Sequence, residues 1–245
     1  MEDEAIAARL AAVRARRGYL LPHHGLMAVL SEPLLEAYDA AYTRLALDPK
    51  VLGVREREFV WLAVLIATDE SAATHHIPKF LSGGGTPEEV AAALRLAAWA
   101  VGAGAAYRFV AEWWTPHLPG FDAWAGYRAD LARLAPPVPL RLAIPAAAAV
   151  HAARHHHAAL AEAIRFTYAE GVPEPELAEA LSIMMFPGSV PHFVEAARVW
   201  LRLIQGGEVA PSPAFAAWAR LGGQGGWDEA SGAKEGGLTA RPAGE

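Results

Sequence analysis

A His-His pair occurs twice in this chain in matching surroundings, and the sequence contains no cysteine. The first pair, His75 and His76, follows an apolar run, and the second pair, His155 and His156, follows a similar run at the same spacing. Imidazole titrates near neutral pH, so each pair is a candidate acid/base site. The absence of cysteine excludes disulfides, thiolate catalysis, iron–sulfur clusters and Cys-ligated zinc.

The first pair has a carboxylate within reach along the predicted helices. Glu58 directly precedes an apolar helix predicted over 59–67. A second helix, predicted to start after Thr68–Ser71, carries both histidines. An inward-facing histidine could then meet Glu58, which would fix the imidazole tautomer and raise its basicity. Adjacent helical residues point about 100° apart, so at most one histidine of the pair faces a given pocket.

Two other features of this segment bear on that interpretation. Pro78 follows the histidines closely, and we expect it to kink or end their helix. Glu58 has an alternative partner, because Arg55 or Arg57 could bind it at the surface while a histidine caps a backbone carbonyl. Spacing alone favours this second interpretation, the surface ion pair.

The second pair lies in a larger cluster that suggests metal binding or anion binding. His151 and His155 stand four residues apart, so on a continuous helix they would share a face, as pairs of metal ligands do. A third ligand would have to come from elsewhere, for example from His192 or Glu162. The alternative is that these histidines are exposed or packed in the core and bind no metal. Arginines such as Arg154 could instead attract a carboxylate substrate.

Composition limits the classes of function. The chain has 245 residues, of which 53% are hydrophobic and 20% charged, and its net charge is −6. No basic block is present, so nucleic-acid binding is not expected. The acidic start lacks the features of a signal peptide, and the longest uncharged apolar run, Phe59–Thr68, is too short to span a bilayer. We expect a soluble, cytoplasmic protein that does not bind membranes.

The pattern of apolar residues and the helix signals predict an all-α fold. Apolar residues recur at three and four, and strand-like alternation is absent. Thr86, Pro87 and Glu89 form a helix start with N-cap, first-turn proline and capping box. Gly83–Gly85 end the preceding helix, because glycine enters left-handed conformations freely.

The order of elements repeats along the chain, which predicts an internal duplication. We divide the chain into N-terminal helices with a first repeat (1–115), a diverged second repeat (116–205) and a flexible Gly-rich tail (206–245). Pro136–Pro139 fall where the second repeat would need a counterpart of Glu58. The second repeat therefore lacks that carboxylate, and we expect the first to be the better catalytic candidate.

Three segments of the first half together resemble a known family. The run 57–63, then His76, then the run 84–90 is similar to the carboxymuconolactone decarboxylase family, which shares an all-helical fold with alkylhydroperoxidase-D-like proteins. The resemblance covers about residues 20–115, and 119–205 resemble a diverged second copy. The peroxidase branch uses a Cys-x-x-Cys before the histidine, and the corresponding stretch, 68–74, has no cysteine, so peroxidase activity is not expected.

The resemblance to the decarboxylase branch implies proton transfer without a cofactor. Glu58 and His76 match the family's glutamate and histidine, with His75 as the alternative because the interval is one residue short. The implied activity is that of a lyase or isomerase acting on a small carboxylated lactone or enolisable acid, in a homo-oligomer such as a trimer or hexamer. The candidate substrate-binding residues are Arg57, Arg154, His155, His156 and His192.

Two other functions remain open at this stage. One is a non-catalytic, oligomeric ligand-binding scaffold that has lost the family's cysteine chemistry. It predicts histidine pairs lying away from any cavity. The other is a metal-binding protein that uses the second cluster, with His151 and His155 as weak candidate ligands.

Overall fold

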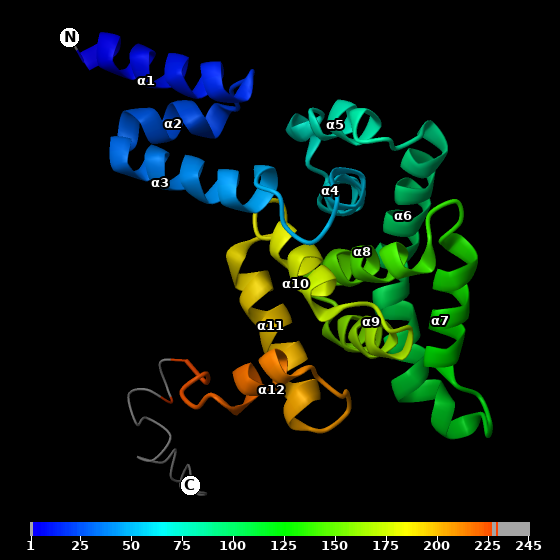
Figure 1. The fold of residues 1–245 in the computed structure, drawn as a ribbon. Helices are drawn as coiled ribbons and strands as arrows, with labels where there is room; N and C mark the ends of the chain where they lie inside the picture. Colours follow the sequence, from blue (N-terminus) through cyan, green and yellow to red (C-terminus); the bar gives the residue numbers. More distant parts are fainter. Residues whose placement is uncertain (1, 227–228, 230–245) are drawn as a thin grey trace, which may run out of the picture.

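The structure, a computed structural model, describes residues 2–226 and residue 229, and every regular element in this part of the chain is helical (Figure 1). The all-α prediction is confirmed. The elements of the first half are α1 (Glu2–Arg17), α2 (Pro22–Leu30), α3 (Glu32–Tyr42), η1 (Thr43–Leu47), α4 (Val54–Thr68), η2 (Ser71–Ala73), α5 (His76–Ser82), α6 (Pro87–Phe109), η3 (Val110–Trp114) and η4 (Thr115–His117). Those of the second half are α7 (Ala123–Leu134), α8 (Leu140–Ala153), α9 (His157–Ala169), α10 (Glu174–Ile183), α11 (Val190–Gln205) and α12 (Pro213–Arg220).

The main core is built around α4 and α8, which pack against each other near the centre of the molecule (Figure 1). Every residue of α8 from Leu142 to Ala153 is buried, as expected for a helix that is apolar on all sides. Its many alanines let α4, α6, α9 and α10 approach closely. One continuous core therefore joins the two halves, and the loop near the predicted boundary at 115/116 only connects η4 to α7.

A second, smaller core holds the three N-terminal helices together. Val13, Ala28 and Leu35 are buried there, separately from the main core. Arg17 of α1 forms an ion pair of 2.6 Å with Asp39 of α3, which fastens the outer helix to the inner one. In Figure 1 these helices form a layer beside the main body, with α2 between α1 and α3. We call α1–α3 the N-terminal layer.

The segment between α4 and α6 differs from its prediction. Asp69 ends α4 in a left-handed conformation (φ 58°), η2 follows, and α5 begins only at His76. The expected effect of Pro78 is therefore wrong. Pro78 lies in the first turn of α5, where the backbone N–H it lacks has no helical partner to lose.

The predicted start of α6 is confirmed. The Thr86 hydroxyl accepts from the Glu89 N–H at 3.3 Å, and a Glu89 carboxylate oxygen accepts from the Thr86 N–H at 3.0 Å. Gly84 takes a positive φ of 94° in the turn before it. This capping box and turn set the direction in which α6 leaves α5.

The second half ends with a docked helix. Pro136–Pro139 connect α7 to α8 as predicted. Near the C-terminus, Phe215 and Trp218 of α12 pack on Trp200, with ring centroids 4.9 and 6.0 Å from it. The predicted tail from residue 227 onward, apart from residue 229, lies outside the described residues.

One helical stretch in the described part of the chain, Pro87–His117, is long and apolar enough to cross a membrane by length and composition. It includes α6, which packs against α4, α7, α8 and α9. The buried residues of α6 are Glu89 in its first turn, one leucine, Leu96, and small residues such as Ala92 and Ala93.

Two glycines of α6 lead to a matched stability test. A Cβ at Gly104 would lie 2.0 Å from Nδ1 of His156, whereas no described atom lies within 4 Å of a Cβ at Gly102. We expect Gly104→Ala to lower the free energy of unfolding by about 1–3 kcal/mol through overpacking. Gly102→Ala should raise it by about 0.5–1 kcal/mol. Urea unfolding measures both, and equal effects of the two substitutions would contradict the packing described.

Candidate active site

A buried glutamate–histidine pair joins α4 to α5. Nδ1 of His76 lies 2.6 Å from Oε2 of Glu58, and each residue is only 1% exposed. An ionised carboxylate can only accept a hydrogen bond, so Nδ1 carries the proton. When the ring is neutral, Nε2 therefore bears the free lone pair. The structure brings His76, and not His75, against Glu58.

The surroundings keep the His76 ring neutral near pH 7. Burial lowers the pKa of His76, although the hydrogen bond to Glu58 and the charge of Glu58 raise it. The charges of Lys79 and Arg57 lower the pKa further. A neutral imidazole whose Nδ1–H is fixed by a carboxylate is a general base at Nε2.

Arg57 supports the carboxylate rather than the cavity. Its side chain is buried beside Glu58, with Nε 3.8 Å from the carboxylate. Another guanidinium nitrogen donates to the backbone oxygen of Asp48 at 3.1 Å. A buried carboxylate needs such compensation, because an isolated charge in the interior is strongly unfavourable.

The two histidine rings lie in a stack of four rings, between a tryptophan and a tyrosine. His76 lies between Trp61 and His75, with ring centroids 4.3 and 4.2 Å away. His75 in turn stacks on Tyr19 at 4.2 Å. The stack passes from α4 through the start of α5 to the loop after α1, so it ties the N-terminal layer to the main core.

His75 has a different set of partners from His76. Its Nε2 lies 2.9 Å from the Tyr19 hydroxyl and 3.2 Å from the Tyr42 hydroxyl. Burial, followed by the neighbouring charge of His76, lowers the pKa of His75 to about 3. His75 is therefore a neutral hydrogen-bonding group near pH 7.

Both histidines line a cavity of about 270 Å³ between the N-terminal layer and the main core. Tyr38, Tyr42, Trp61 and Phe186 give it aromatic walls, and Phe186 comes from the loop between α10 and α11. Such a cavity fits a small, planar molecule.

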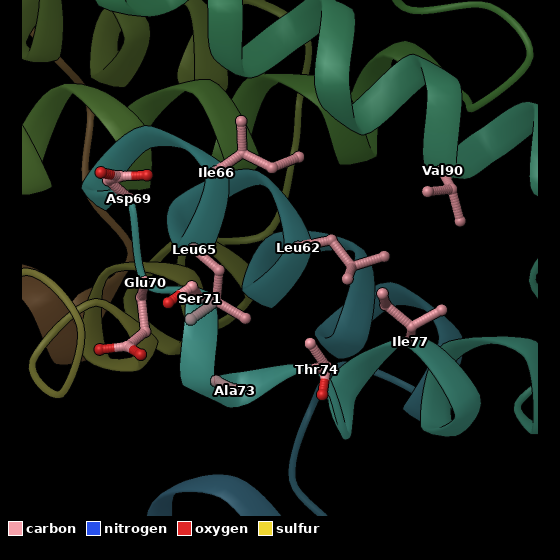
Figure 2. Close-up of a pocket in the computed structure, with 10 residues that line it drawn as sticks. All are labelled: Leu62, Leu65, Ile66, Asp69, Glu70, Ser71, Ala73, Thr74, Ile77 and Val90. Carbon is pink, nitrogen blue, oxygen red and sulfur yellow. The ribbon is translucent and has the colours of Figure 1, made fainter.

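A larger groove of about 370 Å³ lies next to this cavity (Figure 2). Its walls are apolar side chains of α4, α5 and α6, including Leu62, Ile77 and Val90. The only carboxylates in its lining are those of Asp69 and Glu70, near one end, and no histidine, lysine or arginine lines it. No histidine lines the groove, whereas His75 and His76 line the smaller cavity, so the smaller cavity is the better candidate for acid/base chemistry.

The predicted substrate-binding arginines do not reach the cavity. Arg57 points to Glu58 and Asp48, as described above. Arg154 is exposed and donates to the backbone oxygen of Ala67 at 3.4 Å. The guanidinium that does line the cavity belongs to Arg17, and it is already bound to Asp39.

The predicted shared helix face of His151 and His155 is wrong. The helix α8 ends at Ala153, and His155 takes a left-handed conformation with φ 59°. His151 is fully buried, with Nε2 2.9 Å from the Tyr127 hydroxyl, whereas His155 is exposed. Within residues 2–226 and 229, no group of three or more His, Cys, Asp or Glu could hold a metal ion.

The other predicted residues of the second cluster also lie away from the cavity. His156 precedes α9 and packs against Gly104. His192 makes a 3.0 Å hydrogen bond from Nδ1 to the backbone oxygen of Ala153, and its ring lies 4.8 Å from that of His155. The structure therefore separates the two histidine pairs.

Of the residues that line the cavity, sequence reasoning found His75 and His76 and missed the others, among them Arg17, Tyr19, Tyr42 and Phe186. Tyr19 and His75 are 56 residues apart, and no local pattern links them. Tyr42 could have been found, because it lies four residues after Tyr38, a spacing that puts both side chains on one face of a helix.

The fold and site define an all-helical protein in which a buried glutamate–histidine pair meets a small aromatic cavity. Residues 32–115 match the model of the Carboxymuconolactone decarboxylase family. The matched segment contains Glu58 and His76, and the match confirms the predicted resemblance for this segment. The match does not extend to the second half, so the tandem duplication stays a prediction. No curated protein and no solved structure matches the chain.

The buried His151 leads to a prediction about pH. Burial lowers its pKa from 6.5 to about 3 in the folded protein. Below pH 6.5 the unfolded chain binds a proton there that the folded protein does not, so stability is lost as the pH falls from 6.5 towards 3. Between these limits the free energy of unfolding of the wild type should fall by about 1.4 kcal/mol per pH unit more than that of His151→Gln. Urea titrations at several pH values measure this, and parallel pH profiles would contradict it.

Proposed function

We propose that this protein is a cofactor-independent lyase or isomerase that moves a proton at carbon in a small enolisable compound. The observation that carries the proposal is the 2.6 Å bond between His76 Nδ1 and Glu58, buried at the edge of a cavity. In this function His76 is the catalytic acid and base through Nε2. Glu58 holds its tautomer and stabilises the imidazolium after the proton arrives.

The same pair serves both reaction types. In an isomerisation, Nε2 takes a proton from one carbon and returns it to another. In a decarboxylation, Nε2 takes the proton of the substrate's carboxylic acid, and the imidazolium gives it to the carbon from which CO₂ leaves. General acid/base catalysis of this kind contributes roughly 10²–10⁴-fold to the rate.

The cavity favours a small and flat substrate, such as a lactone or an enolisable acid. A volume of about 270 Å³ and aromatic walls suit a single ring. Arg17 is the guanidinium in the lining, and Asp39 binds it at 2.6 Å. A substrate carboxylate in the cavity would therefore contact Arg17, whose charge Asp39 already pairs, and not Arg57 or Arg154. We propose that the protein recognises its substrate mainly through the enolisable carbon.

The location and assembly of the protein are part of the same proposal. A cytoplasmic enzyme fits a chain without cysteine. Assembly into a homo-oligomer such as a trimer or hexamer is supported by exposed aromatic side chains after α6, including Trp113 and Trp114, which are 62% and 52% exposed. The non-catalytic scaffold has less support, because it requires histidine pairs away from any cavity.

Deuterium exchange tests the proposal without knowledge of the natural substrate. The protein is incubated in D₂O with small lactones, β-keto acids and cyclic ketones, and NMR follows deuterium entering the enolisable carbon. We expect wild-type protein to accelerate exchange in at least one compound. His76→Gln should lower that rate by roughly 10²–10⁴-fold, and Glu58→Gln should lower it less.

His157→Gln is the matched control, because His157 lies in the second histidine cluster, outside the cavity. Circular dichroism checks that each variant is folded. Exchange by His76→Gln at the wild-type rate, or no acceleration of any compound by the wild type, would contradict the proposed function.

A further inference from the structure

Two tyrosine hydroxyls and one imidazole nitrogen meet beside the catalytic histidine. The Tyr19 and Tyr42 hydroxyls lie 2.9 and 3.2 Å from Nε2 of His75. The two hydroxyl oxygens are 3.4 Å apart, which is long for an O–H···O hydrogen bond. We call Tyr19, Tyr42 and His75 the hydroxyl cluster.

The hydroxyl cluster has more protons than good acceptors. Each tyrosine brings one O–H, and Nε2 of a neutral His75 offers at most one lone pair. If one hydroxyl donates to Nε2, the other can reach only a phenol oxygen 3.4 Å away. If Nε2 carries the ring proton instead, both hydroxyl protons lack a nitrogen acceptor. In either tautomer, an oxygen atom placed in the cavity would be a better acceptor than the cluster itself provides.

Arg17 places a positive charge beside the cluster, Asp39 binds that guanidinium, and the Glu70 carboxylate also lines the cavity. The guanidinium of Arg17 lies over the Tyr42 ring, 4.3 Å from its centroid. Burial raises the pKa of Tyr42, so its hydroxyl stays protonated and acts as a donor. Burial lowers the pKa of His75 to about 3, so its ring is neutral and adds no charge to the cluster.

The cluster also lies at the right place relative to the base. His75 and His76 are neighbours in the ring stack, 4.2 Å apart, and both line the same cavity as the two tyrosines. A molecule of one ring can therefore present a carbon to His76 and an oxygen to the hydroxyls.

We propose that Tyr19 and Tyr42 form an oxyanion site for the enolate produced when His76 removes a proton. His75 is the positioning residue that orients the two hydroxyls. This inference rests on the proposed function and specifies its substrate class, a carbonyl compound whose enolate oxygen is bound by neutral donors.

The step balances as follows. The C–H bond next to the carbonyl breaks, its proton goes to Nε2 of His76, and its electron pair forms a C=C bond. The carbonyl π electrons move to oxygen, where the hydroxyls stabilise the charge. Return of the proton to a carbon restores the carbonyl and the neutral imidazole. Donors fixed in advance at the position of a developing charge stabilise such a transition state strongly.

The oxyanion site extends beyond the family-matched segment. Tyr42 and His75 lie within residues 32–115, whereas Tyr19 and Arg17 come before it. Residues before the matched segment therefore supply one of the two donors, Tyr19, and the guanidinium of Arg17. We infer that these residues adapt the glutamate–histidine pair of the matched segment to a substrate of its own.

A phenol that changes colour on ionisation tests the oxyanion site directly. 4-Nitrophenol is mixed with the protein at the pH where the free probe is half ionised, and the visible absorbance of its phenolate is recorded. We expect the bound probe to be mainly phenolate. Tyr19→Phe and Tyr42→Phe should each lower the phenolate-to-phenol ratio of the bound probe roughly 10-fold or more, because a hydrogen bond to a charged group is lost.

Tyr38→Phe is the matched control, since it removes a hydroxyl from the same cavity without touching the bonds to His75. It should change the ratio less than either other variant. Equal ratios in all three variants and the wild type, or no binding of the probe to the wild type, would overturn the oxyanion site.

This result is independent of the proton-transfer test, because 4-nitrophenol has no enolisable carbon. Deuterium exchange without phenolate binding would overturn the oxyanion site and leave the proposed function standing. Phenolate binding that depends on both hydroxyls, without exchange, would support the site and contradict the proposed function.

Discussion

Burial of the Glu58 carboxylate is the constraint on which the rest of the structure depends. A carboxylate that is 1% exposed must be compensated within the protein, and His76 and Arg57 provide that compensation from two directions. His76 can reach Glu58 only because α4 ends at Asp69 and the chain turns back before α5 begins. The turn and the pair therefore support each other.

The same constraint decides where the cavity lies. With Nδ1 bound to Glu58, the His76 ring is held in the stack from Trp61 to Tyr19, which crosses from the main core to the N-terminal layer. The cavity is the space left where these two cores meet, and the loop carrying Phe186 closes it from the second half of the chain. Residues from three distant parts of the sequence therefore share one site, as is common where a ligand binds between packed units.

Features that depend on neighbouring residues could be predicted from the sequence. The all-α fold, the capping box at Thr86 and the glycine turn before it follow from local propensity and hydrogen bonding. Helix spacing placed Glu58 within reach of the two histidines but did not exclude a surface ion pair with Arg55 or Arg57. The choice of His76 needed the actual turn. Features set by tertiary contacts could not be predicted. Tyr19 reaches His75 only through packing of the N-terminal layer, and the expected pairing of His151 with His155 failed because α8 ends two residues before His155.

The tautomer and charge of His76 test the central claim most directly. ¹⁵N NMR of imidazole-labelled protein at neutral pH distinguishes the two ring nitrogens. The buried pair predicts a neutral ring with the proton on Nδ1 and a bare Nε2, and it predicts that Glu58→Gln weakens this preference and lowers the pKa of His76, because the carboxylate that raises it is gone. A proton on Nε2 of a neutral ring, or a spectrum of His76 unchanged by Glu58→Gln, would contradict the account.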